Sequence, residues 1–287
     1  MVCQEHAGVP FLTFEKLSQI PCIKHGFSTR MGGVSEGIYS SMNLSYTRGD
    51  EEKAVTKNFR RMMAALKMDS SNLVFSDQTH TTNIRVVTAK DRGKGFTKER
   101  DYSDIDGLIT NVPGLVLATF YADCVPLYFV DPVKKAIGLS HSGWRGTVGK
   151  IGLKTVERMQ VEYGCNPADM IGCIAPSICQ DCYEVSEDVI AEFDKAFGED
   201  AGLLYYKKEN GKYQLNLWKA NELVMKEAGL TKDHIVVTDI CTCCNADKLF
   251  SHRASHGQRG NLGAFLMLKE EKELEKTNTD CVKMVCG

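Results

Sequence analysis

The sequence predicts a chain in which helices and buried strands alternate. Apolar residues recur at helical spacing in four segments, and short, uniformly apolar runs lie between these segments. Uniformly apolar strands are typical of sheets that are covered on both faces. Neither standard glycine-rich phosphate loop is present.

Four helices are expected from the apolar spacing and from capping residues. Asp50 is the predicted N-terminal cap of the first helix, and the acidic residues after it favour a helix N-terminus. Ser186 and Asn216 are the predicted caps of the last two. The expected helices run from Glu51 to Lys67, from about Thr147 to Tyr163 with Gly164 as a stop, from Ser186 to Gly198, and from Asn216 to Gly229.

Nine strands are expected where short apolar runs are bounded by turn residues. They are Leu73–Phe75, Ile84–Thr88, Gly107–Thr110, Leu115–Tyr121, Leu127–Val130, Ala136–Ser140, Met170–Ala175, Ile235–Thr238 and Ala264–Leu268.

Length and composition favour one large domain over residues 1–287. No Pro-, Gly- or Ser-rich linker divides the chain, no segment repeats, and 43% hydrophobic residues supply material for a core. A charged segment from Lys269 to Glu273 predicts a solvated helix end, with a frayed tail from about residue 272. The formal net charge of -2 gives no electrostatic basis for binding nucleic acid or a membrane surface.

The cysteine content and the N-terminal sequence both bear on the cellular compartment and on whether the thiols are reduced. The chain has 12 cysteines, but its first residues lack a basic segment followed by an apolar stretch, so we expect a cytoplasmic protein with reduced thiols. The longest apolar stretch, Leu115 to Ala122, is too short to span a bilayer, and no transmembrane segment is expected.

Three chemically distinctive side chains follow expected strands. His80, Cys124 and His141 each lie at a strand end, where a cleft can form. Two imidazoles and one thiolate suit a catalytic zinc with an open fourth position, and they also suit a copper electron-transfer centre. Cys124 could instead be a nucleophile with a histidine base, and all three residues could simply be packed in the core.

Several segments carry a resemblance to a known protein family. They are His25 to Arg30 with Gly32 and Gly33, Asn43 to Ser45, Gly49 and Asp50, Ser76 to His80, Ala122 to Pro126, Leu139 to Gly146, Ile174 to Ile178, Cys182 to Val185, Asp239 to Thr242, and Leu249 to Arg253. In these segments the chain resembles the YfiH/YlmD/FAMIN, or laccase-domain-containing, family. The family was once labelled polyphenol oxidases and is now regarded as purine nucleoside phosphorylases with additional adenosine deaminase activity.

The resemblance has consequences for fold, cofactor and chemistry. It implies an α+β fold of mixed β-sheets packed together and flanked by helices. It also implies a catalytic metal on His80, Cys124 and His141, with zinc expected and copper as the alternative. The implied partners are phosphate and purine nucleosides: adenosine, inosine, guanosine and also methylthioadenosine.

Further candidate site residues surround these motifs. The Arg30 guanidinium beside Ser28 could bind phosphate, as could Arg145, which follows His141 at an expected helix start. Asn43 is another candidate for substrate or phosphate binding, in a segment that matches the family.

Gln78 and Asp123 flank the proposed ligands and could orient them through hydrogen bonds, although Asp123 could equally point away from Cys124. The family usually has an arginine-containing turn near residues 259–262. This chain has Asn261 at the corresponding position, and Arg259 is a candidate replacement.

Five other cysteines have the pair spacing of a structural zinc site. They are Cys179, Cys182, Cys241, Cys243 and Cys244. Because two predicted helices lie between the pairs, which is far more than a zinc ribbon contains, free or packed thiols are favoured over a second zinc.

Other functions remain open on the residues alone. The chain has seven histidines and no His-x-His pair, which disfavours a multicopper oxidase but not a mononuclear copper polyphenol oxidoreductase. A Cys-His nucleophile hydrolase and a non-enzymatic partner-binding protein are the remaining alternatives. The usual zinc deaminase signature is absent, so deamination would require an independent solution.

Overall fold

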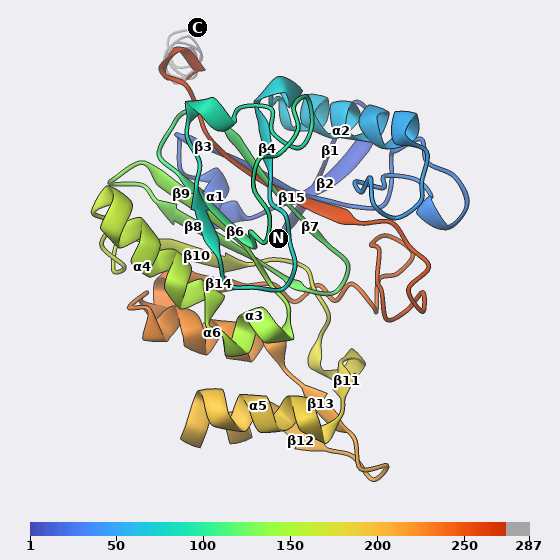
Figure 1. Ribbon diagram of the computed structural model, residues 1–287, viewed down its shortest axis with the longest axis vertical. Helices are drawn as coiled ribbons and strands as arrows, with labels where there is room; N and C mark the ends of the chain where they lie inside the picture. The colour runs from blue at the N-terminus through green and yellow to red at the C-terminus, as the bar shows by residue number, and fades with distance from the viewer. Residues whose placement is uncertain (274–287) are drawn as a thin grey trace, which may run out of the picture.

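Two six-stranded β-sheets form the centre of the computed structural model, which describes residues 1–273 (Figure 1). The first sheet has the order β1 (Val2–His6), β2 (Val9–Thr13), β3 (Ile23–Ser28), β15 (Leu262–Leu268), β7 (Val116–Tyr121), β4 (Leu73–Phe75). The second has the order β14 (Ile235–Val237), β10 (Ile171–Ile174), β8 (Val125–Asp131), β9 (Ala136–Ser142), β6 (Gly107–Thr110), β5 (Ile84–Val86).

Both large sheets are mixed. Neighbouring strands are antiparallel except in the pairs β4–β7, β5–β6 and β10–β14, which are parallel. A small antiparallel sheet follows, in the order β11 (Glu184–Val185), β13 (Tyr213–Leu215), β12 (Tyr205–Lys207). The helices are α1 (Glu15–Ser18), α2 (Glu52–Leu66), α3 (Trp144–Val148), α4 (Ile151–Tyr163), α5 (Glu187–Phe197) and α6 (Leu217–Glu227).

The two large sheets pack face to face with helices outside. Alternate residues of β7 show the layering, because side chains of a strand point to opposite faces. Leu117 joins the cluster between the sheets with Tyr128 and Leu139, whereas Val116 packs with Phe59 of α2. Figure 1 shows α2 on one side of the molecule and α4 and α6 on the other, with α5 beside the small sheet. The expected α+β fold of packed mixed sheets flanked by helices is confirmed.

All nine expected strands are present, with ends shifted by at most a few residues. Six further strands were not expected. Pro10 lies within β2, Lys24 and His25 interrupt the apolar pattern of β3, and β1 is exposed throughout. β11, β12 and β13 contain only two or three residues each, which is too short for a periodic signal.

The expected helix over 147–163 was wrong at its start. The chain instead forms α3 and then α4, because Lys150 between them adopts a left-handed conformation with φ 56° and no continuous helix can pass through it. Gly164 ends α4 as expected, also in a left-handed conformation.

The capping predictions had different outcomes. Asn216 caps α6, since its side chain accepts a hydrogen bond from the Lys219 amide. Asp50 does not cap α2, because its carboxylate accepts hydrogen bonds from Ser35 and Asn43 instead. Ser186 occupies the cap position of α5, but its hydroxyl bonds to Asp188 and not to a backbone amide.

Two expectations concern the chain as a whole. The frayed tail is expected from about residue 272, and its part beyond residue 273 lies outside the described residues. The single domain over residues 1–287 stays a prediction. Among residues 1–273 no helix combines the length and the apolar character that crossing a bilayer requires.

Candidate metal centre and its pocket

The three predicted metal ligands lie where the chain connects the two large sheets. His80 is on the segment from β4 in the first sheet to β5 in the second, and Cys124 ends the turn from β7 to β8. His141 is near the end of β9, opposite Pro126 of β8 in the strand register. The sheet packing therefore brings together residues that are distant in sequence.

The ligand atoms of these residues converge on one point. All lie within 4.8 Å of one another, and the two imidazole ring centroids are 4.8 Å apart. Gly143 leaves room for this arrangement, because a Cβ atom there would lie 2.6 Å from His80 Nδ1 and 3.2 Å from Cys124 Sγ. His141 is buried, Cys124 half-buried and His80 exposed, so one side of the cluster is open.

Asp106 supports both histidines, although sequence reasoning missed it. Its carboxylate lies 2.7 Å from His141 Nδ1, which leaves Nε2 of this ring free for a metal. The same carboxylate accepts hydrogen bonds from the backbone amides of Thr79, His80 and Thr81 at 3.1, 3.2 and 2.8 Å. Asp106 thus holds the left-handed His80, with φ 66°, in place.

The pKa values follow from burial and from these contacts. Burial lowers the pKa of His80, and His141 lowers it further, so the imidazole is neutral at pH 7. For His141 the effect of burial is outweighed by the neighbouring Cys124 sulfur and by Asp106, which raise its pKa to about 9. Burial would raise the pKa of Asp106, but the hydrogen bonds from His141 and the backbone hold it below its ordinary value.

Asp123 and Gln78 hold backbone segments and make no hydrogen bond to the ligand side chains. Asp123, with φ 86°, accepts hydrogen bonds from the Thr242 hydroxyl and the Arg253 amide, both at 2.7 Å. Gln78 bonds to the amide and the carbonyl of Phe120, each at 2.7 Å. Both residues fix the turns that carry His80 and Cys124.

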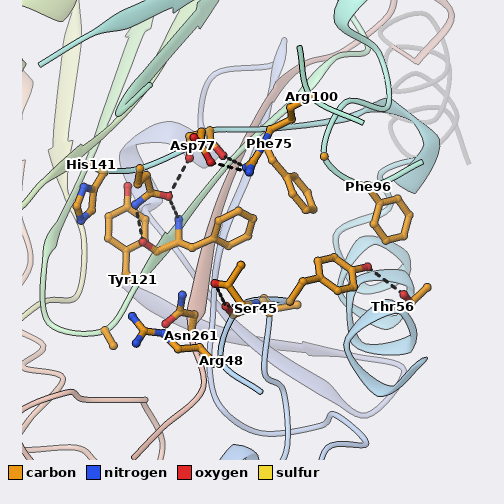
Figure 2. A pocket seen from close by; sticks show the side chains of 18 of the residues that line it. Ser45, Arg48, Thr56, Phe75, Asp77, Phe96, Arg100, Tyr121, His141 and Asn261 are labelled. Atoms are coloured by element: carbon orange, nitrogen blue, oxygen red, sulfur yellow. Dashed lines mark hydrogen bonds and ion pairs between the residues drawn. The ribbon is translucent and has the colours of Figure 1, made fainter. Parts of the chain in front are cut away.

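A pocket of about 920 Å³ opens from the predicted metal ligands (Figure 2). His80, Cys124 and His141 line it at one end. Aromatic side chains line it further away, where the Phe75 and Phe120 rings meet edge to face with centroids 4.9 Å apart. The lining also includes Phe96, Tyr121, Arg48, Arg259 and Asn261.

Two arginines give the pocket an excess of positive charge. Arg259 is 7% exposed and its Nε atom has no hydrogen-bond partner. Within residues 1–273, neither Arg48 nor Arg259 forms an ion pair with a carboxylate. Burial and the neighbouring Arg48 lower the pKa of Arg259 to about 10, so it stays cationic at pH 7. Arg259 Nη1 donates to Asn261 Oδ1 and to the Gly260 carbonyl, and Nη2 lies 3.5 Å from His252 Nδ1. Two guanidinium groups that have no carboxylate partner are a chemically suitable anion site.

The sequence-based phosphate candidates lie outside this pocket lining. Arg30 donates from Nε and Nη1 to the carbonyls of Ser40 and Ala246, and its guanidinium lies over the Phe250 ring. Arg145 is exposed and stacks on Trp144.

Ser28 and Asn43 support the pocket indirectly. The Ser28 hydroxyl accepts a hydrogen bond from the Gly263 amide, and Asn43 Oδ1 accepts one from the Asn261 amide, both at 2.9 Å. They hold the segment that carries Arg259 and Asn261 into the pocket. The signal available in the sequence for Asp106 was only its position directly before the expected strand Gly107–Thr110, and nothing in the sequence distinguishes Arg48.

Comparison with known proteins defines the class to which this site belongs. Residues 24–269 match the family model described as "Multi-copper polyphenol oxidoreductase laccase". The chain is 36% identical to the "Purine nucleoside phosphorylase YlmD" of Bacillus subtilis, over 85% of this chain and 88% of that protein. It is 33% identical to an "Adenosine deaminase RL5" from an unknown prokaryotic organism, over 79% and 87% of the two chains.

A solved structure has the same fold. The YfiH protein of Bacillus licheniformis, described as hypothetical, superimposes with a TM-score of 0.87 at 35% identity, covering 93% of this chain and 99% of that one. The chain therefore belongs to the YfiH/YlmD family, whose curated members include purine nucleoside phosphorylases.

Proposed function

We propose that this protein is a metal-dependent purine nucleoside phosphorylase that also deaminates adenosine. The main observation is the His80, Cys124 and His141 cluster, which opens into a pocket that also contains two arginines without a carboxylate partner among residues 1–273. The relatives named as a phosphorylase and as a deaminase support this proposal. The substrates would be adenosine, inosine, guanosine or methylthioadenosine, with phosphate as the second substrate.

The donor set fits zinc, with copper as the alternative. His80, Cys124 and His141 would hold the ion, with Asp106 fixing the His141 ring through Nδ1. A zinc ion at such a site acts as a Lewis acid and lowers the pKa of bound water to about 7. Three protein ligands and an exposed His80 side leave access from the pocket, as a catalytic site requires.

Phosphate would bind between Arg48 and Arg259. In phosphorolysis a phosphate oxygen forms a bond to C1′ of the ribose, while the bond from C1′ to the purine nitrogen breaks and its electron pair leaves with the base. Arg259 suits this role because it is buried and has an unpaired Nε donor, so little water competes for the anion. The purine would lie against the aromatic wall of Phe75, Phe96 and Phe120.

Deamination uses the same pocket with a different nucleophile. Water attacks C6 of adenosine, and ammonia leaves with the electron pair of the C6–N bond. This reaction needs no phosphate, so it depends less on Arg48 and Arg259. Phosphate-independent formation of inosine is therefore the distinguishing property of the second activity.

The test is a product assay on metal-replete protein. Inosine with phosphate is expected to give hypoxanthine and ribose 1-phosphate, and adenosine alone is expected to give inosine, each measured by chromatography. Cys124→Ala should lose both reactions, whereas Cys3→Ser, an exposed cysteine of β1, should keep them. Absence of both products from the wild-type protein would contradict the proposal. Phenol oxidation by the copper-loaded protein in that case would favour an oxidoreductase.

The cytoplasmic location expected from the sequence stays a prediction. It is checked by cell fractionation with an antibody to this chain.

A further inference from the structure

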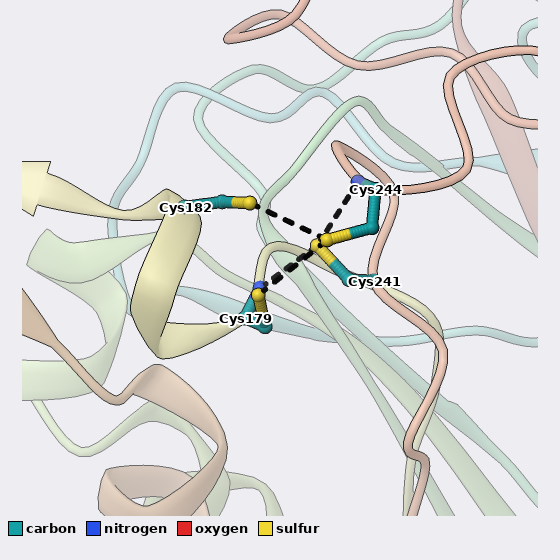
Figure 3. Close-up of side chains that lie close together, drawn as sticks. All are labelled: Cys179, Cys182, Cys241 and Cys244. Atoms are coloured by element: carbon teal, nitrogen blue, oxygen red, sulfur yellow. Dashed lines mark hydrogen bonds between the residues drawn. The ribbon is translucent and has the colours of Figure 1, made fainter.

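Four cysteines outside the pocket form a second candidate metal site (Figure 3). Cys179 and Cys182 lie in the segment after β10, and Cys241 and Cys244 lie in the turn after β14. Their sulfur atoms all lie within 4.8 Å of one another, although residues 183–240 separate the two pairs. The small sheet, α5 and α6 are inserted between the two pairs. The fold therefore brings together four cysteines whose spacing in the sequence disfavoured a shared metal site.

The sulfur positions match those around a tetrahedral metal ion. Zinc–sulfur bonds of about 2.3 Å place two tetrahedral ligands about 3.8 Å apart. The Sγ atom of Cys244 lies 3.5 Å from that of Cys182 and 4.0 Å from that of Cys179. These distances exceed the sulfur–sulfur bond of a disulfide, about 2.05 Å, and one ion would satisfy all four sulfurs at once.

Backbone amides further favour a thiolate in this cluster. The amides of Cys179 and Cys244 donate hydrogen bonds to the Cys241 sulfur at 3.3 and 3.4 Å. Amide donors stabilise sulfur that carries negative charge, which is the form that binds metal. Cys243 lies in the same turn and contacts Cys182, but it is outside the four-sulfur group and also packs against apolar side chains.

Residues next to the four-cysteine cluster form hydrogen bonds with the turn that carries Cys124. The Ile178 amide donates to the Asp123 carbonyl at 2.9 Å, and the Thr242 hydroxyl donates to the Asp123 carboxylate at 2.7 Å. These donors belong to the residues next to Cys179 and Cys241. A metal ion that joins the two cysteine segments would therefore hold both partners of Asp123 together.

We propose that Cys179, Cys182, Cys241 and Cys244 bind a structural zinc ion, separate from the ion at His80, Cys124 and His141. Four thiolates complete the coordination sphere and leave no position for substrate, as in structural zinc sites. The ion joins the segment before the small sheet to the segment after β14. It thereby stabilises the backbone around Asp123.

The proposal is tested in the Cys124→Ala background, which removes a ligand of the other site. The protein is purified with a reductant, dialysed against zinc-free buffer and analysed for metal by mass spectrometry and X-ray absorption. One zinc per chain is expected, with sulfur neighbours only, at about 2.3 Å. Adding Cys182→Ser and Cys244→Ser should remove this zinc, whereas adding Cys243→Ser should leave it bound.

Several outcomes would overturn the proposal. One is a Cys124→Ala protein that holds no zinc, and another is a retained ion with nitrogen neighbours. A third is a Cys182–Cys244 disulfide, detected as a mass loss of two hydrogens. Since Cys124→Ala is expected to be inactive in any case, these results do not depend on whether the protein cleaves nucleosides.

A measurement on the unchanged cysteine cluster covers the case in which the serine variants fail to fold. The Cys124→Ala protein is titrated with a thiol reagent before and after a zinc chelator is added. Four additional thiols are expected to react on chelation, in step with the release of one zinc. Chelation that exposes no additional thiols would contradict the proposal.

Discussion

The two cysteine-containing clusters of this protein differ in ligand type, in exposure and in what lies around them. His80, Cys124 and His141 provide three ligands of mixed chemistry and face a large pocket with cationic and aromatic walls. Cys179, Cys182, Cys241 and Cys244 provide four identical ligands and lie between chain segments. A site with three ligands leaves a position for chemistry, whereas a site with four stabilises the fold.

The two clusters are connected through Asp123. Asp123 immediately precedes Cys124, and its carboxylate accepts a hydrogen bond from Thr242, the neighbour of Cys241. The four-cysteine cluster can therefore affect activity through the contacts of its neighbouring residues with Asp123. Substitutions in the two clusters should separate loss of chemistry from loss of stability.

The largest effect is expected for Cys124→Ala. Loss of this ligand should reduce phosphorolysis and deamination at least about a thousandfold, which corresponds to about 4 kcal/mol of transition-state stabilisation. The melting temperature should change by only about 3 °C or less, because the sheet core does not depend on this side chain. Kinetics and calorimetry on the same sample check both expectations. Global unfolding would instead make this cluster the structural one.

Asp106→Asn should have the next largest effect. The variant keeps the shape of the side chain but removes the carboxylate that holds His141 and the His80 loop, so metal affinity should fall about 10- to 100-fold. A zinc titration with a competing chelator measures this change. Asp104→Asn is the matched control, since Asp104 bonds to the Thr79 hydroxyl but does not contact His141. Equal metal affinity in both variants would exclude Asp106 as a positioning residue.

Arg259→Lys tests whether phosphate binds at Arg259 in the pocket. Lysine keeps the charge but loses the guanidinium fork, so the KM for phosphate should rise about tenfold, or about 1.4 kcal/mol. Deamination should change much less because it uses water. Arg30→Lys is the comparison, since the Arg30 guanidinium is bound to backbone carbonyls outside the pocket lining. A larger rise in KM for Arg30→Lys than for Arg259→Lys would instead place phosphate at Arg30.

The smallest effect on activity is expected for the Cys182→Ser, Cys244→Ser double variant. Its turnover at 25 °C should stay within about tenfold of wild type, because no reacting atom is touched. Its melting temperature should fall by at least about 5 °C, since a structural ion contributes to folding. Thermal unfolding monitored by circular dichroism provides the measurement. A melting temperature equal to that of wild type would mean that the cluster binds no stabilising ion.

Sequence patterns predicted the parts of the site that have an unusual residue at a strand end. The buried strands β7, β8 and β9 were recognisable as apolar runs, so Cys124 and His141 could be placed beside them. Asp106 could not be assigned its role, because that role depends on β6 and β9 being paired. The positions of Arg48 and Arg259 depend on loops, whose conformation has no periodic pattern.

The four-cysteine cluster shows why chain separation is a poor guide to distance. Its two cysteine pairs are divided by the small sheet and two helices, and spacing alone therefore favoured separate thiols. The parallel pairing of β10 and β14 brings both segments to the same edge of the second sheet. Such a contact depends on tertiary structure, whereas β1, β2 and β3 of the first sheet were missed for a local reason, their polar and interrupted sequence.

The most direct test of the division between the two clusters is to measure zinc content and ribose 1-phosphate formation in the same samples. Wild-type protein is expected to hold two zinc ions per chain and to be active. Cys124→Ala should hold one and be inactive, and the Cys182→Ser, Cys244→Ser variant should hold one and remain active. Activity in Cys124→Ala, with none in a folded Cys182→Ser, Cys244→Ser variant, would contradict this division.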